Sequence, residues 1–169
     1  MSYELAQVNI ARLLAPLDSA TLKDFVDLLD PVNAAADASP GFVWRLQGED
    51  GNATGVQSFA WDAGDSAGVI VNLSVWTGID ALAAYVFGEL HVQVLRRRRE
   101  WFERMREAYT VCWWVPAGHR PTTDETEERI RELRAHGVSP RAFTLRQHFP
   151  PPVPSQHATR PAAEVSSIS

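Results

Sequence analysis

The chain has 169 residues, a hydrophobic fraction of 45% and six tryptophans, which is apolar material for one compact domain and little more. Its net charge of −5 argues against nucleic acid as a partner. No apolar run approaches the roughly 18 residues that a membrane span needs. Cys112 is the single cysteine, so neither an internal disulfide nor a Cys-based zinc site is expected, and a cytoplasmic location follows by default.

The first half of the chain predicts three strands and one helix, with a further strand in doubt. Alternation over 5–11 indicates a half-buried strand. Apolar residues at helical spacing over 19–38 indicate a helix, which Pro31 should kink or end near residue 30. The stretches 42–47 and 69–76 are the next strands, and 56–61 is a possible return strand between them.

In the second half, Gly78 is expected to open one long helix that runs to about Arg106. A strand should follow at 109–115, then a helix at 123–135 and a last short strand at 143–149. Thr122 followed by Glu125 has the spacing of a capping box before that helix. From Pro150 the periodicity ends, so we predict one domain over 1–149 and a disordered Pro-rich tail over 150–169.

This order of elements predicts an α+β fold, a ferredoxin-like antiparallel sheet with helices on one face. The odd-numbered side of the strand at 69–76 is fully apolar and suits a helix-covered core. The other side, with the matching side of the first strand, mixes polar and apolar groups: Gln7, Asn9, Ile70, Asn72, Ser74 and Trp76. We expect this mixed face to lack a helix layer, and therefore to pair with its copy in a homodimer or to line a cavity.

Several stretches resemble the bacterial protein family known as the domain of unknown function DUF3291. They are LAQVNIARLLAPLD, NAAADASPGFVWRLQGEDGNAT, LRRRREWFERM and WWVPAGHRPT. The family is similar to the dimeric α/β-barrel superfamily, in which two ferredoxin-like subunits join their sheets around internal pockets. Relatives in that superfamily include antibiotic-biosynthesis monooxygenases, haem-degrading monooxygenases, haem proteins similar to chlorite dismutase, and small-molecule isomerases. The resemblance therefore implies a fold and a dimer, but it does not choose a chemistry.

His91 is the first candidate for a functional residue. It shares a helical stripe with Phe87, Val94, Arg98 and Trp101, which places it on or beside the buried face. It is either a core histidine bonded to the backbone, a general acid or base, or a haem ligand, as the resemblance to haem-degrading relatives implies. No second ligand residue stands four positions away, so local spacing gives a metal site little support.

Four consecutive arginines, 96 to 99, point nearly all the way round a helix. We expect Arg96 to pair with Glu100 and Arg99 to pair with the glutamate at 103, on a solvated surface. Arg97 and Arg98 flank the Trp101 stripe. Either their stems cover apolar surface, or one of them donates to a carboxylate of the chain or of a ligand.

The remaining candidates are a histidine in a turn and several tryptophans. His119, in a Gly-His-x-Pro turn, either holds that turn or orients its imidazole at a pocket mouth. Trp44, Trp76 and Trp114 either belong to the core or form an aromatic wall beside Gln7 for a planar ligand.

The resulting hypothesis is a small-molecule enzyme of secondary metabolism, without a cofactor. It would act on a hydrophobic or aromatic metabolite by monooxygenase-like, cofactor-free oxygenation or by cyclisation or isomerisation. His91 and His119 are the catalytic candidates, and the substrate-binding candidates are Gln7, Asn9, Trp44, Asn72, Ser74, Trp76, Arg97, Arg98 and Trp114. Two alternatives stay open: a haem-binding protein with His91 as axial ligand and the arginines at the propionates, and a non-catalytic dimer that binds a small ligand.

Overall fold

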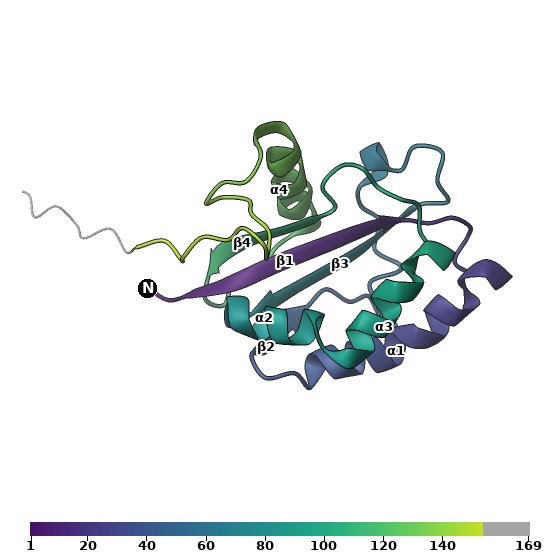
Figure 1. Ribbon diagram of the computed structural model, residues 1–169, viewed down its shortest axis with the longest axis horizontal. Helices are drawn as coiled ribbons and strands as arrows, with labels where there is room; N and C mark the ends of the chain where they lie inside the picture. The colour runs from purple at the N-terminus through teal and green to yellow at the C-terminus, as the bar shows by residue number, and fades with distance from the viewer. Residues whose placement is uncertain (154–169) are drawn as a thin grey trace, which may run out of the picture.

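The computed structural model describes residues 1–153, and the elements follow one another as in Figure 1. They are β1 (Tyr3–Arg12), η1 (Ala20–Leu22), α1 (Lys23–Asp37), β2 (Phe42–Arg45), η2 (Ala60–Asp62), β3 (Val69–Trp76), α2 (Ile79–Val86), α3 (Glu89–Arg97), η3 (Arg98–Glu100), β4 (Thr110–Pro116) and α4 (Thr123–His136). Of the predicted tail, residues 150–153 carry no regular structure and the rest lies outside the described residues. None of the helices within 1–153 is long and apolar enough to cross a membrane.

The strands form an antiparallel sheet in the order β2-β3-β1-β4. The two central strands pair in a register that sets Leu5 opposite Trp76 and Asn9 opposite Asn72. Helix α1 connects β1 to β2, and α2 with α3 connects β3 to β4, so the chain follows the ferredoxin-like β-α-β-β-α-β path. The predicted α+β, ferredoxin-like fold is confirmed.

Helices α1, α2 and α3 cover the mixed face of the sheet (Figure 1). Leu82 of α2 packs in one apolar cluster with Leu5 and Trp76, and Val94 of α3 packs near Ile70 in another. The expectation that this face lacks a helix layer is therefore wrong. The alternation in β3 separates the two faces correctly but does not say which one the crossover helices cover.

The opposite face is also covered within the chain. Helix α4, which follows the last strand, places Ile130 and Leu133 against the apolar side of β1, β3 and β4 (Figure 1). Phe59, from the segment 46–68, joins the same cluster and is fully buried. Because both faces carry a layer, a sheet-to-sheet dimer would require one layer to move. The homodimer remains a prediction, but it can no longer be argued from an uncovered face of the sheet.

Besides the long helix predicted from Gly78, which is broken at Gly88, three other stretches differ from their predictions. Pro31 lies inside α1 without ending it, because packing of the helix on β2 and α3 outweighs one lost backbone hydrogen bond. The stretch 56–61 forms no strand and ends in the short turn of η2. At 143–149 there is a single bridge, Phe143 to Cys112, in place of a strand. Phe59 and Phe143 are fully buried, so the last two stretches each contribute a side chain to the core without forming a strand.

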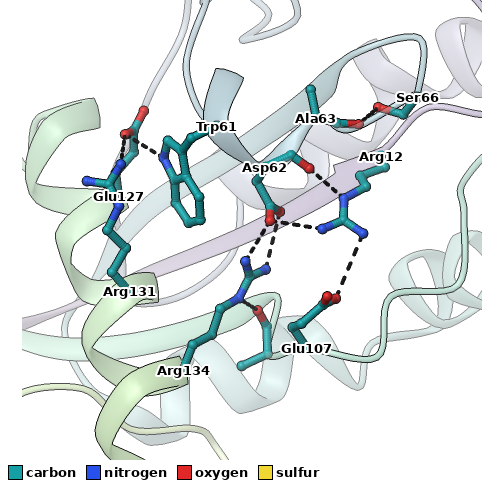
Figure 2. A network of polar contacts seen from close by, with 10 residues as sticks. Arg12, Trp61, Asp62, Ala63, Ser66, Glu107, Glu127, Arg131 and Arg134 are labelled. Carbon is teal, nitrogen blue, oxygen red and sulfur yellow. Dashed lines mark hydrogen bonds and ion pairs between the residues drawn. The ribbon is translucent and has the colours of Figure 1, made fainter.

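Segment 46–68 is attached to the sheet and to α4 through Asp62 (Figure 2). The Asp62 carboxylate accepts hydrogen bonds from Arg12 at 2.9 Å and from Arg134 at 2.6 and 3.2 Å, and its side chain is 6% exposed. Arg12 also donates to the Asp62 carbonyl oxygen. Nearby, the Trp61 indole donates to Glu127 of α4. These contacts join three parts of the chain that are distant in sequence.

Gly41 is a position where we expect a strong effect on folding. Its φ is +81°, and a Cβ there would lie 2.5 Å from both the Ala81 Cβ and the Thr77 Oγ1. Gly41→Ala should therefore lower the free energy of unfolding by about 2 kcal/mol or more, from left-handed strain plus overlap. Gly55→Ala, where nothing lies within 4 Å, is the control. Urea denaturation measures both, and equal losses would contradict this account.

Candidate functional site

A cavity of about 190 Å³ lies between the mixed face of the sheet and helices α1 and α3. Its floor comes from β1 and β3, one wall from α1, and the other from α3, η3 and the chain that leads to β4. The α1 wall is mostly apolar and comprises Phe25, Leu28, Leu29, Val32 and Asn33. The walls thus suit an apolar ligand, and polar groups enter the cavity at a few positions.

His91 reaches the cavity because the predicted long helix is broken at Gly88. Helix α2 ends at Val86, and α3 begins with Gly88 as its N-cap. The break leaves the Val86 carbonyl oxygen near the imidazole, and His91 Nδ1 lies 3.0 Å from it. A carbonyl oxygen only accepts, so Nδ1 is the donor and carries the proton. His91 Nε2 is then the basic nitrogen.

The surroundings keep His91 neutral. Burial lowers its pKa from the usual histidine value, and the hydrogen bond to Val86 offsets this only in part. The imidazole also contacts the ring of Tyr85 at a centroid distance of 5.1 Å, and Tyr85 stacks on Trp76. Burial raises the pKa of Tyr85 to about 12, so the phenol stays protonated at neutral pH. Of these two groups, His91 is the one that can accept a proton.

Asn9 and Asn72 lie opposite each other on the central strands and line the cavity floor. Asn72 is exposed although it is in the middle of β3, between buried residues, because the cavity opens above it. Neither side-chain amide has a hydrogen-bond partner elsewhere in residues 1–153. Two neighbouring amides offer both N–H donors and carbonyl acceptors to a ligand.

The four consecutive arginines, 96 to 99, do not form the ion pairs that the sequence predicted. Arg97 pairs with Glu100 and with Asp24 of α1, both at 2.8 Å, and lies over the Trp101 ring. Its guanidinium thus ties α3 to α1 at the surface. The expected pairs of Arg96 with Glu100 and of Arg99 with Glu103 do not form in the described part of the chain, because the tighter turn of η3 brings position 97 over 100.

Arg98 and Arg99 line the cavity, whereas Arg96 and Arg97 do not. Arg98 Nη1 donates to the Tyr109 hydroxyl in a long hydrogen bond of 3.4 Å. The prediction had placed Arg99 on the solvated side together with Arg96. Its side chain is exposed but stands at the edge of the cavity.

The other candidates from the sequence lie outside this cavity. Ser74 is buried between Gln7, at 3.3 Å, and the Trp76 indole, at 2.9 Å, so these three residues bond to one another. Trp44 lies opposite Val75 and packs in the cluster of the second face. The Trp114 indole donates to the Phe149 carbonyl oxygen.

His119 does not line the cavity and contacts α4 instead. Its Nε2 lies 2.7 Å from a Glu125 carboxylate oxygen, and the other oxygen accepts from the Trp113 indole. The Thr122 hydroxyl accepts from the Glu125 backbone N–H, as predicted for the helix cap. The structure therefore gives His119 a contact that joins the turn to the first turn of α4.

Sequence reasoning missed the α1 wall and several polar residues of the cavity, namely Asn33, Arg45, Arg99, Glu103 and Tyr109. The α1 residues carried a signal in their helical spacing, which predicted the helix but not that it lines a cavity. Tyr109 could have been found from its place just before β4, where its carbonyl oxygen accepts from Ile10 at the end of the cavity floor.

The cavity does not fit haem. Its volume is close to that of a protein cavity of about 150 Å³ that binds benzene, and a tetrapyrrole is several times larger. Of the predicted propionate partners, Arg97 is held by two carboxylates. Within residues 1–153, no group of three or more His, Cys, Asp or Glu side chains could hold a metal ion.

Solved structures share part of this fold at low identity. PA3566 from Pseudomonas aeruginosa is 13% identical, with a TM-score of 0.44 over 72% of this chain and 98% of that one. NE2512, a protein of unknown function from Nitrosomonas europaea, is 10% identical, with a TM-score of 0.43 over 71% and 96%. SnoaB, a cofactor-independent oxygenase from Streptomyces nogalater, is 16% identical, with a TM-score of 0.42 over 70% and 97%.

No curated protein matches the sequence. A family model does, over residues 4–159, which covers the strands and helices described above except for Tyr3, the first residue of β1. The resemblance noted in the sequence is thereby confirmed. The chain belongs to the family described as Domain of unknown function (DUF3291).

Proposed function

We propose that this protein is a small-molecule enzyme that acts on a hydrophobic or aromatic metabolite in the cavity between α1, α3 and the sheet. The observation that carries the proposal is the state of His91. His91 lines the cavity as a neutral imidazole with its proton fixed on Nδ1 by Val86, which leaves Nε2 as the basic nitrogen. A structural histidine would not need to line such a cavity.

The proposed reaction begins with proton transfer from a weakly acidic C–H or O–H group of the substrate to His91 Nε2. The charge left on the substrate is stabilised by N–H donors of Asn9 and Asn72. Return of the proton to another atom gives an isomerisation, and attack of the carbanion on an internal electrophile gives a cyclisation. Reaction of the same carbanion with dioxygen gives an oxygenation without a bound cofactor. The proposal also includes a role in secondary metabolism, a cytoplasmic location and a homodimer.

Proton abstraction is common to all three reactions, so it is the step to test. Phenylacetone is a neutral, single-ring ketone whose benzylic protons exchange slowly with solvent. With the protein in D₂O, we expect NMR to show faster loss of these proton signals than buffer alone gives. Val94→Phe, which adds volume at the α3 wall, should abolish the acceleration, while Val26→Phe on the exposed side of α1 should not. Exchange no faster than in buffer, for phenylacetone and for related aryl ketones, would contradict the proposal.

A further inference from the structure

The cavity carries an uncompensated positive charge. Four charged residues line it: Arg45, Arg98, Arg99 and Glu103. Arg45 is neutralised by Asp37, to which it donates twice at 2.7 and 3.3 Å, and its third contact is the Gly51 carbonyl oxygen. That leaves two guanidinium groups facing a single carboxylate.

Neither of these guanidinium groups is in an ion pair within residues 1–153. Arg98 donates one of its five N–H groups to the Tyr109 hydroxyl in a long hydrogen bond, and this acceptor carries no charge. Arg97, the neighbour that does not line the cavity, is paired with two carboxylates. The chain as a whole carries a net charge of −5, and the cavity nevertheless keeps one cation in excess.

The volume and length of the cavity limit the size of the ligand that it can hold. A volume of about 190 Å³ suits one substituted ring. His91 and Arg98 are seven positions apart, which is about 10.5 Å along a helix, so they address opposite ends of a ligand. The side chains shorten that span, and a ring with a short chain between its two polar ends is long enough to meet both.

Resting on the proposed function of this cavity, we propose that its substrate is a monoanionic aryl-alkyl carboxylate. Arg98, supported by Arg99, binds the carboxylate, and the group that loses a proton lies at the His91 end. A guanidinium binds a carboxylate through two parallel hydrogen bonds, which also fixes the orientation of the ring. The anion site thus determines which end of the molecule reaches the base.

Hydrocinnamate, hydrocinnamamide and phenylpropylamine test this inference, because they share one ring and chain and carry an anionic, a neutral and a cationic end. Calorimetric titration at pH 7 should show the acid binding at least about tenfold more tightly than the amide, with the amine weakest. Arg98→Gln should weaken binding of the acid about tenfold to a hundredfold and leave the amide nearly unchanged. Arg99→Gln should also weaken binding of the acid, but by a smaller factor than Arg98→Gln, since the Arg99 side chain is more exposed.

Arg96→Gln is the matched control, because it removes the same charge two positions away in the same run of arginines but outside the cavity. If Arg96→Gln and Arg98→Gln weaken the acid equally, the effect is a general one of net charge and the inference is wrong. Equal binding of acid and amide by the native protein overturns the anion site alone, and phenylacetone exchange then still supports the proposed function. Failure of all three compounds to bind overturns the inference together with the cavity as a site for single-ring ligands.

Discussion

Replacing Asp62 by alanine should lower the free energy of unfolding by about 3 to 5 kcal/mol. The change removes the acceptor for Arg12 and Arg134 and leaves two guanidinium groups in a site where little water reaches them. Their side chains are 19% and 16% exposed, so solvent replaces the lost bonds only in part. The same change removes the carboxylate contacts of segment 46–68 with β1 and α4, while the Trp61 bond to Glu127 remains.

The size of this effect is measured by urea denaturation at pH 7, with two comparison variants. Asp62→Asn keeps the shape and one acceptor oxygen, so it should be destabilising by less than alanine. Asp27→Ala removes an exposed carboxylate that pairs with Lys23, and it should change the free energy of unfolding by less than about 0.5 kcal/mol. A loss in Asp62→Ala no greater than in Asp27→Ala would show that the network around Asp62 does not hold the fold.

The contribution of Asp62 should depend on pH in a defined direction. Burial acts to raise the pKa of its carboxyl, but hydrogen bonds and charge from Arg134 and Arg12 outweigh burial and hold the pKa below its usual value. A carboxyl with a lowered pKa in the folded state stabilises the fold above its unfolded pKa, and this stabilisation is lost as pH falls through the folded value. The difference between native protein and Asp62→Ala should therefore shrink under acid, below pH of about 4.

The strand pattern predicted the sheet well because each strand has one uniform face. In β3 the alternation set its limits, 69–76, and separated Asn72 from its apolar neighbours. The helix-capping signal at Thr122 did the same for α4. Such local signals depend on a few adjacent residues and are visible without knowledge of tertiary contacts.

What the sequence did not predict depends on contacts between distant segments. The break at Gly88 has a glycine as its only local sign, yet it decides where His91 points. In the arginine run, one of the two partners of Arg97 is Asp24, which is 73 positions away. The cover of the second face by α4 likewise depends on tertiary packing, which no periodicity in one helix reveals.

The candidate site shows the same limit. The mixed face of the sheet was recognised as unusual, with a cavity as one of two explanations, and Asn9 and Asn72 do line a cavity. Gln7 and Ser74 have the same polarity and alternation, but they bond to each other beneath the α2 side of the sheet. Polarity at alternate positions therefore identified the face, while the placement of the helices above it determined which polar residues are accessible.

His91→Gln should slow exchange of the benzylic protons of phenylacetone by about a hundredfold to ten-thousandfold, if His91 is the general base. Glutamine keeps an N–H that can donate to the Val86 carbonyl oxygen, so the turn between α2 and α3 is preserved while the basic nitrogen is lost. His148→Gln is a matched control, because His148 also directs Nδ1 at a backbone carbonyl oxygen but lies outside the cavity. The His148→Gln variant should exchange the benzylic protons of phenylacetone at the native rate.

The pH profile of that exchange separates a base from a group that only shapes the cavity. The neutral imidazole is the reactive form, and burial holds the pKa of His91 below the ordinary value of about 6.5. The exchange rate, corrected for the buffer reaction, should therefore be constant through neutral pH and fall only as pH drops below that lowered pKa. In His91→Gln the fall should disappear together with most of the rate. A variant that keeps the native acid limb, or a rate within threefold of the native one, would assign proton abstraction to another group and leave His91 as a residue that links α2 to α3.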